Sequence, residues 1–142
     1  MNLFVYGTLM DPEIMALVAG EAGNGQTARL SGYVRRRVSG ECYPAIVPQA
    51  GAVVDGLLYA GLSPKILERL DRFEGENYFR RTVLVELAEE KRVMAQTYVF
   101  VDKCRDRLSD ENWSLEAFQG DKAGFVKADQ GFISATRGNE KV

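Results

Sequence analysis

The sequence predicts an α+β fold in which about six strands form a small mixed β-barrel with flanking helices. Two observations support this prediction. Segments rich in strand-forming residues outnumber the two or three segments with helical periodicity, which favours a closed or nearly closed sheet over an alternating parallel one. The chain also has no internal repeat, linker or domain boundary, so its 142 residues are expected to form one domain, residues 1–142, with one core.

The chain is expected to begin with a buried strand, Leu3–Tyr6, because a run of strand-forming apolar residues stops at a glycine. A tight loop, Gly7–Met10, follows. Asp11 then suits a helix N-cap, and the proline after it suits the first position of a helix over Pro12–Val18. A strand, a glycine turn and a helix N-terminus together present backbone N–H groups that favour an anion. Taken alone, Gly7 is more simply an ordinary turn glycine.

Further strands are predicted in the next part of the chain, after a glycine-rich turn at Gly20–Gly25. The first is Ala28–Val34, which has a mixed pattern. Prolines bound the next, Tyr43–Pro48, so we expect it at the edge of a sheet. The strand Val53–Tyr59 contains Gly56, which indicates a bulge or the close approach of another backbone.

Arg35, Arg36 and Arg37 form a basic run of a kind that can contact nucleic acid. Alternate residues of a strand face opposite ways, so the three side chains do not form one patch. No aromatic ladder accompanies them, and the chain has a net charge of -2. We therefore interpret this run as a solvated face and expect no nucleic-acid partner.

A helix is predicted from Pro64 to Glu74, with Ser63 as its N-cap. At ~100° per residue its apolar side chains share one arc: Ile66, Leu67, Leu70 and Phe73. Glu74 falls within that arc, so its carboxylate is aimed with the apolar side chains. Burial and the negative end of the helix dipole would both raise its pKa towards the range of a general base. The alternative is an ion pair with Arg80 or Arg81 under the sheet.

The second half of the chain is predicted to contain a β-hairpin. Two long strands, Tyr78–Leu87 and Val93–Val101, are joined by a short polar segment. The remaining predicted elements follow in order: a loop at Lys103–Asp110, a helix at Trp113–Phe118, a short helix within Gly120–Gly131 and a frayed tail from about Thr136.

Composition excludes several classes of site. The absence of histidine removes Ser-His and Cys-His nucleophile pairs and most zinc sites. Cys42 and Cys104 are too few for a disulfide framework, and Cys42 has no histidine to deprotonate it. No apolar run approaches the ~20 residues that span a bilayer, and the first residues lack the features of a secretory signal. We therefore expect no membrane partner and a cytoplasmic location with reduced thiols.

Two motifs carry a specific resemblance. Tyr6-Gly7-Thr8-Leu9 directly follows the first predicted strand, and the later segment contains Leu70-Asp71-Arg72-Phe73-Glu74-Gly75 and then Tyr78-Phe79-Arg80. At this separation the chain resembles the γ-glutamylcyclotransferase-like family, and within it the AIG2-like and γ-glutamylamine cyclotransferase-like proteins. The similarity spans about Asn2–Phe118, and its supporting segments are Tyr43–Val47, Val54–Tyr59 and Trp113–Phe118.

The resemblance implies the γ-glutamylcyclotransferase-like fold, a small β-barrel with flanking helices and a pocket at one mouth. Matched by position, the implied site residues are Tyr6, Gly7, Thr8, Leu9, Glu74 and Tyr78. Glu74 matches the family's catalytic acid-base glutamate. The loop after Tyr6 matches the one whose backbone N–H groups hold the substrate α-carboxylate, and Tyr78 matches a tyrosine of the pocket wall.

The implied reaction is an internal aminolysis of a small γ-glutamyl substrate. The substrate α-amine attacks its own side-chain carbonyl, giving 5-oxoproline and a released amine or amino acid. The nucleophile belongs to the substrate, so no protein nucleophile, metal or cofactor is needed, which agrees with the absence of histidine. The leaving amine and the oligomeric state stay open. The alternative is a non-catalytic module that binds γ-glutamyl or other amino-acid carboxylates, and release of 5-oxoproline distinguishes the two.

Overall fold

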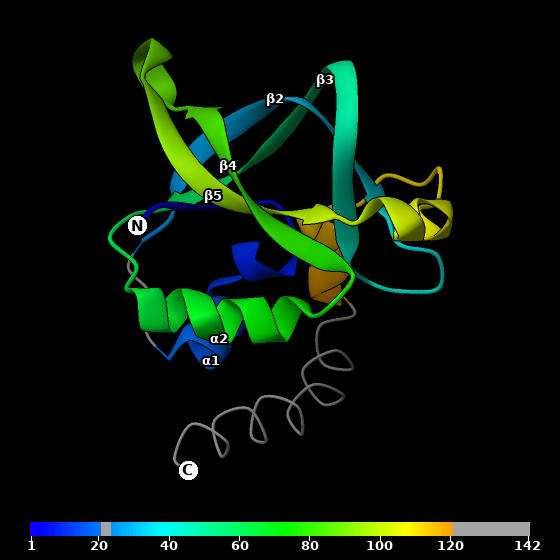
Figure 1. The fold of residues 1–142 in the computed structure, drawn as a ribbon, viewed down its shortest axis with the longest axis horizontal. Coiled ribbons are helices and arrows are strands. Elements are labelled where there is room, and N and C mark those ends of the chain that lie inside the picture. Colours follow the sequence, from blue (N-terminus) through cyan, green and yellow to red (C-terminus); the bar gives the residue numbers. More distant parts are fainter. Residues whose placement is uncertain (21–23, 121–142) are drawn as a thin grey trace.

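The computed structural model describes residues 1–20 and 24–120, in which five strands form a closed barrel (Figure 1). The strands are β1 (Leu3–Val5), β2 (Gln26–Arg37), β3 (Pro44–Tyr59), β4 (Tyr78–Glu86) and β5 (Arg92–Phe100). Around the barrel they follow the order β1-β3-β2-β4-β5. Neighbouring strands are antiparallel except β5 and β1, which close the barrel as a parallel pair with Leu3 opposite Gln96. The mixed barrel confirms the predicted fold class.

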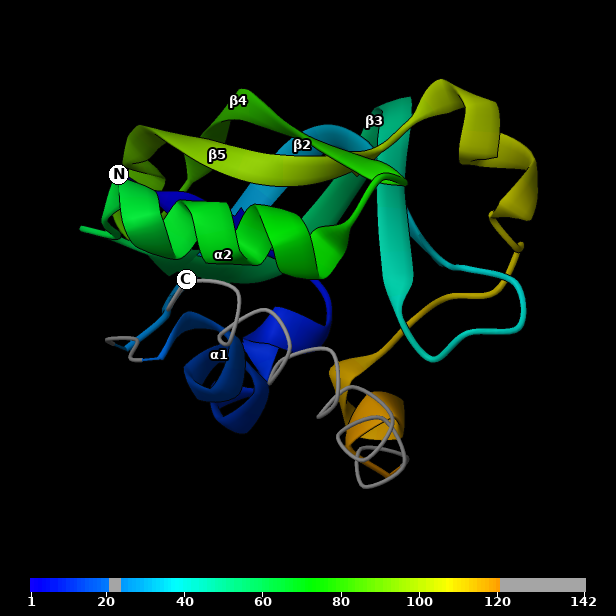
Figure 2. The ribbon, with the colours of Figure 1, turned by 60° about the horizontal axis from the view of Figure 1, so that its bottom comes forward.

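Two α-helices, α1 (Pro12–Ala19) and α2 (Pro64–Glu74), lie side by side against one side of the barrel (Figures 1 and 2). Three short 3₁₀ turns are η1 (Thr8–Met10), η2 (Ala88–Glu90) and η3 (Asp102–Arg107), and residues 115–120 form a further helical segment. Within the described residues, no helix has both the length and the apolar character that a membrane crossing requires.

The predicted strands Tyr43–Pro48 and Val53–Tyr59 are two halves of one strand, β3, which is why the barrel has five strands and the prediction about six. The residues between the halves are largely exposed, which breaks the apolar pattern as a loop would. Gly51 on β3 and Gly32 on β2 both have positive φ, and the pairing register shifts beside Gly32, so the ribbon bends without ending. The half Tyr43–Pro48 is predicted to lie at the edge of a sheet, and Pro44–Pro48 does pair with a strand on one side only, β2.

Other predictions fare differently. The segment Lys103–Asp110 is predicted as a loop but contains most of η3. The prediction missed this turn because the segment is polar, although the turn surrounds the buried Cys104. The helix predicted at Trp113–Phe118 is present but begins later, at residue 115. The helix predicted within Gly120–Gly131 and the tail from Thr136 lie outside the described residues, as does the middle of the turn Gly20–Gly25.

Helix α2 has the predicted bounds, and local chemistry sets both of its ends. The Ser63 hydroxyl accepts the Ile66 N–H at 3.2 Å and so caps the first turn. Gly75, with φ +81°, ends the helix directly after Glu74. The apolar arc packs against α1 and the outer wall of the barrel in one cluster that includes Ile14, Met15, Ile66, Leu67, Leu70 and Phe73. The capped ends and the buried arc together fix Glu74 in the last helical position.

The strand prediction for Gly56 is confirmed as a close backbone approach. A Cβ at Gly56 would collide with the Val5 carbonyl oxygen and lie 2.7 and 2.8 Å from two carbons of the Phe4 ring. Both neighbours belong to β1, the strand that leads into the predicted anion-binding loop. Glycine at this point therefore allows β1 to sit tightly against β3.

We predict that Gly56→Ala lowers the free energy of unfolding by ~1–3 kcal/mol, the usual cost of overpacking a core. Urea denaturation followed by circular dichroism measures the change. The control is Gly120→Ala, because a Cβ there meets no atom of the described residues within 4 Å. This control should stay within ~1 kcal/mol of the wild type. Equal stability of the two variants would contradict the close approach of β1.

Candidate active site

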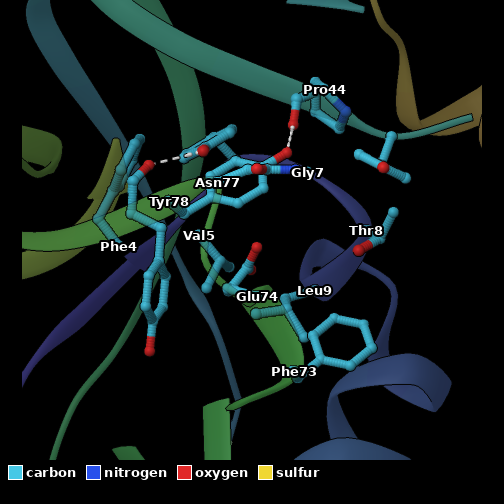
Figure 3. A pocket seen from close by; sticks show the side chains of 13 residues that line it. Phe4, Val5, Gly7, Thr8, Leu9, Pro44, Phe73, Glu74, Asn77 and Tyr78 are labelled. Carbon is cyan, nitrogen blue, oxygen red and sulfur yellow. Dashed lines mark hydrogen bonds between the residues drawn. The ribbon is translucent and has the colours of Figure 1, made fainter. Parts of the chain in front are cut away.

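A cavity of about 230 Å³ lies where β1 ends, β3 and β4 begin and α2 stops (Figure 3). All the site residues predicted from the sequence line it: Tyr6, Gly7, Thr8, Leu9, Glu74 and Tyr78. The rest of the wall consists of Phe4, Val5, Tyr43, Pro44, Phe73, Asn77 and Tyr98. Among the described residues of this wall, Glu74 alone has a side chain that can be charged near neutral pH.

The Glu74 side chain extends from the end of α2 into this cavity, opposite Gly7, Pro44 and Tyr78 (Figure 3). Within the described residues it forms no hydrogen bond or ion pair. The ion pair considered for it is not formed, because Arg80 contacts Asp71 instead, at 3.0 Å. Its carboxyl group is therefore left to face the cavity.

Burial, and to a smaller extent the nearby Asp71 carboxylate, raise the pKa of the Glu74 carboxyl to about 8. Asp71 lies one helical turn earlier, on the same face of α2. The Arg80 guanidinium neutralises part of the Asp71 charge. A carboxyl with a pKa of about 8 can both accept and return a proton close to neutral pH.

The loop after β1 presents its backbone to the same cavity. It forms η1, in which the N–H groups of Met10 and Asp11 bond back to the carbonyls of Gly7 and Thr8. In the described residues the N–H groups of Gly7, Thr8 and Leu9 have no backbone acceptor, as expected at the start of such a turn. They remain available for an anion in the cavity.

Gly7 is required for space rather than for a positive φ. Its φ is −129°, so the loop does not need a left-handed residue there. A Cβ at Gly7 would lie 2.8 and 2.9 Å from two carbons of the Pro44 ring, which forms the adjoining part of the wall. The restriction comes from β3, which the local sequence of the loop does not reveal.

Three tyrosines hold the wall together through hydroxyl groups that already have acceptors. Tyr6 donates to the carbonyl of Tyr98 at 2.6 Å, Tyr98 donates to Asp71 at 2.7 Å, and Tyr78 donates to the carbonyl of Pro44 at 2.9 Å. Burial raises the pKa of each of these phenols well above its usual value. The hydroxyls therefore stay protonated near neutral pH and act as donors that position the wall.

Arg35 is not part of a solvated face, contrary to the sequence interpretation. Its half-buried guanidinium donates to the carbonyls of Tyr6 and Asp55, at 2.7 and 2.9 Å, and lies over the ring of Trp113. Burial lowers the pKa of Arg35, although a guanidinium remains charged near neutral pH. Arg36 and Arg37, also half-buried, make separate contacts with Asn112 and Glu111.

Sequence reasoning missed several residues around the cavity. Asp71 lies within the motif that identified Glu74, and its position three residues earlier on the same helical face is a signal that could have found it. Tyr98 lies in a predicted strand, but its contact with Asp71 joins residues 27 positions apart. Pro44 and Arg35 act through tertiary contacts that no local pattern encodes.

The geometry defines a class of protein: a small closed barrel with a carboxyl-bearing cavity at one end. A solved structure of a gamma-glutamyl cyclotransferase shares this fold with a TM-score of 0.63 at 20% identity, over 70% of this chain and 66% of that one. The solution structure of a protein from Arabidopsis thaliana is similar with a TM-score of 0.69 at 31% identity, covering 96% of this chain and 83% of that one.

Sequence comparison narrows the class to one family. AIG2-like protein C of Arabidopsis thaliana is 36% identical over 138 residues, which cover 96% of this chain and 80% of the relative. The family model described as "Gamma-glutamyl cyclotransferase, AIG2-like" matches residues 3–115. The chain belongs to this family, as the resemblance of its motifs predicted.

The raised pKa of Glu74 predicts a stability that depends on pH. A carboxyl whose pKa is higher in the folded than in the unfolded state stabilises the fold fully below pH 4.5, and this contribution is lost as the pH rises towards about 8. Between pH 5 and pH 8 we expect the free energy of unfolding of the wild type to fall by ~2 kcal/mol relative to that of Glu74→Gln. This difference is smaller than the full pKa shift would give, because the carboxyl faces the cavity. Urea unfolding of both proteins at the two pH values measures this, and parallel pH curves would contradict it.

Proposed function

We propose that this protein is a γ-glutamyl cyclotransferase, which converts a γ-glutamyl compound to 5-oxoproline and releases an amine or amino acid. Membership of the family and the small cavity support a small-molecule substrate. The single observation that carries the proposal is the Glu74 carboxyl, which faces the cavity, has no counter-ion among the described residues and has a pKa of about 8. Neither Cys42 nor Cys104 is in a disulfide, which fits the cytoplasmic location that we also propose.

The proposed reaction is an acyl transfer within the substrate. The ionised Glu74 takes a proton from the α-ammonium, and the free amine attacks the side-chain carbonyl. A carbon–nitrogen bond closes the five-membered ring as the bond to the leaving amine breaks. Glu74 gives this proton to the leaving amine nitrogen. The ring nitrogen then gives up a second proton, which also passes to the released amine by way of Glu74, so the carboxylate is regenerated. Holding amine and carbonyl in near-attack geometry supplies most of the acceleration in such an intramolecular step.

The loop Gly7–Leu9 is proposed to hold the substrate α-carboxylate through its backbone N–H groups. Support comes from their lack of backbone acceptors in the described residues and from the position of the loop on the cavity wall. This placement leaves the α-ammonium on the side of Glu74, which faces Gly7 across the cavity (Figure 3). Tyr6 and Tyr78 form wall on either side of the substrate.

Glu74→Gln should reduce turnover by at least ~10², because glutamine keeps the shape but cannot take a proton. In the wild type, kcat/KM should fall as the pH drops below about 8, the pKa of the Glu74 carboxyl, and this dependence should be lost in the variant. Release of 5-oxoproline measured by mass spectrometry gives both results. Near-full activity of Glu74→Gln would exclude Glu74 as the base.

Gly7→Val should reduce kcat/KM by ~10², because the added side chain collides with Pro44 and displaces the loop. Thr8→Ser is the matched control, since it leaves the backbone unchanged and should stay within about threefold of the wild type. Thermal unfolding of both variants separates a displaced loop from a lost fold. A normal kcat/KM in Gly7→Val would contradict the proposal that the backbone N–H groups of this loop bind the α-carboxylate.

Replacing the α-carboxylate of the substrate by a carboxamide removes a charge-assisted contact and should lower kcat/KM by about 10- to 100-fold. If acid and carboxamide react equally well, the loop does not hold the carboxylate. If the protein binds γ-glutamyl compounds but releases no 5-oxoproline from any of a panel, it is a non-catalytic binding module instead.

A further inference from the structure

Arg35 contacts the carboxylate-binding loop from behind. It is a residue of β2 and is not one of the residues that line the cavity. Its guanidinium nitrogen Nη1 donates to the carbonyl oxygen of Tyr6 at 2.7 Å. The same nitrogen donates to the carbonyl oxygen of Asp55 on β3 at 2.9 Å, which fixes the guanidinium in place.

The carbonyl of Tyr6 and the N–H of Gly7 are the two ends of one peptide plane. No peptide bond in the described residues is cis, so this oxygen and this hydrogen point in opposite directions. With the carbonyl held by Arg35, the N–H points away from Arg35, and Gly7 lines the cavity. A cation on the carbonyl end also draws electron density along the plane and makes the N–H a stronger donor.

Among the described residues, the cavity wall contains no lysine or arginine. A substrate carboxylate would enter a space whose one ionisable carboxyl is Glu74, which repels it when ionised. The compensating positive potential must therefore come from backbone N–H groups and from charges behind them. Arg35 is a cation in direct contact with that backbone.

Arg35 is also linked to a second part of the wall. Its guanidinium carbon lies 5.4 Å from the centre of the Trp113 ring, and the Trp113 indole N–H donates to the Cys42 carbonyl at 2.7 Å. The next residues along the chain, Tyr43 and Pro44, line the cavity, and the Pro44 ring lies beside Gly7. The guanidinium therefore contacts the supports of two adjoining parts of the wall.

We propose that Arg35 is a positioning residue of the carboxylate subsite, which orients and polarises the Tyr6–Gly7 peptide from outside the cavity. The inference rests on the proposed function, because it concerns the subsite that function requires. It separates two roles for Arg35. A residue that only supports the fold affects every ligand equally, whereas a residue that polarises the Gly7 N–H acts on ligands that carry the α-carboxylate.

The test compares γ-L-glutamylbenzylamine with its α-carboxamide on the wild type and on Arg35→Gln. Glutamine removes the charge, and because its side chain ends two bonds short of the arginine Nη1, it also gives up the hydrogen bond to the Tyr6 carbonyl. We expect kcat/KM for the acid to fall about tenfold and that for the carboxamide about twofold, so that the preference for the acid falls about fivefold. A merely structural residue leaves this preference unchanged.

Two further variants refine the comparison. Arg36→Gln removes a charge from the next position of β2, where the side chain contacts Asn112 and not Tyr6, and it should keep the full preference for the acid. Arg35→Lys retains the charge and should keep that preference within threefold of the wild type. Thermal unfolding verifies that each variant folds. If Arg35→Gln does not fold, Arg35→Lys decides the question: loss of its preference for the acid over the carboxamide overturns the proposal.

The outcomes distinguish this proposal from the proposed function. If the wild type releases no 5-oxoproline but binds the acid more tightly than the carboxamide by calorimetry, the proposed catalysis fails for this probe. The same ratio, taken from dissociation constants, then decides the role of Arg35. An unchanged preference in Arg35→Gln overturns the role of Arg35 while leaving catalysis intact. A wild type that does not distinguish acid from carboxamide by either measure overturns the subsite and with it the role of Arg35.

Discussion

A carboxyl group held in a small cavity without a counter-ion is the constraint on which the arrangement around it depends. Ionising Glu74 in this position is costly, and the cost appears as a pKa of about 8. Helix α2 offsets it by burying its apolar arc, with Ser63 fixing one end and Gly75 the other. Arg80, which could have neutralised Glu74, is held by Asp71. The fold thus holds a carboxyl group that is costly to ionise where a ligand in the cavity can reach it.

The walls around that carboxyl are held by hydrogen bonds that leave few groups free to move. Tyr6, Tyr98 and Asp71 link β1, β5 and α2 in a chain of bonds, and Tyr78 links β4 to β3. Each phenol stays protonated because burial raises its pKa. Rigid donors of this kind suit a reaction whose main requirement is the geometry of the substrate.

Local patterns were enough to predict the elements that carry the site. Helical periodicity placed Glu74 on the apolar arc of α2, and the order of strand, glycine and proline placed the loop at Gly7. Both predictions depend on residues close together in the sequence. Motif resemblance then supplied the family, which the comparisons confirm.

What could not be predicted depends on contacts between distant segments. Arg35 and Tyr6 are 29 residues apart, so a three-arginine run looked like solvated surface although its first member supports the loop. Gly7 looked like an ordinary turn glycine, whereas its restriction comes from the ring of Pro44, 37 residues further along the chain. The two halves of β3 looked like separate strands because their exposed link interrupts the pattern, although β2 pairs with both.

Because β1 closes the barrel, the cavity at its end can form only after the strands that pair with β1 are in place. Leu3 pairs with Tyr59 on one side and Gln96 on the other, so the first strand waits for partners encoded far downstream. During synthesis, β1 and the loop after it leave the ribosome before β3 and β5, and their position is fixed only once β5 has emerged. Such long-range pairing makes closure a late and slow event of folding. An unfinished chain therefore contains the residues of the site without the cavity that unites them.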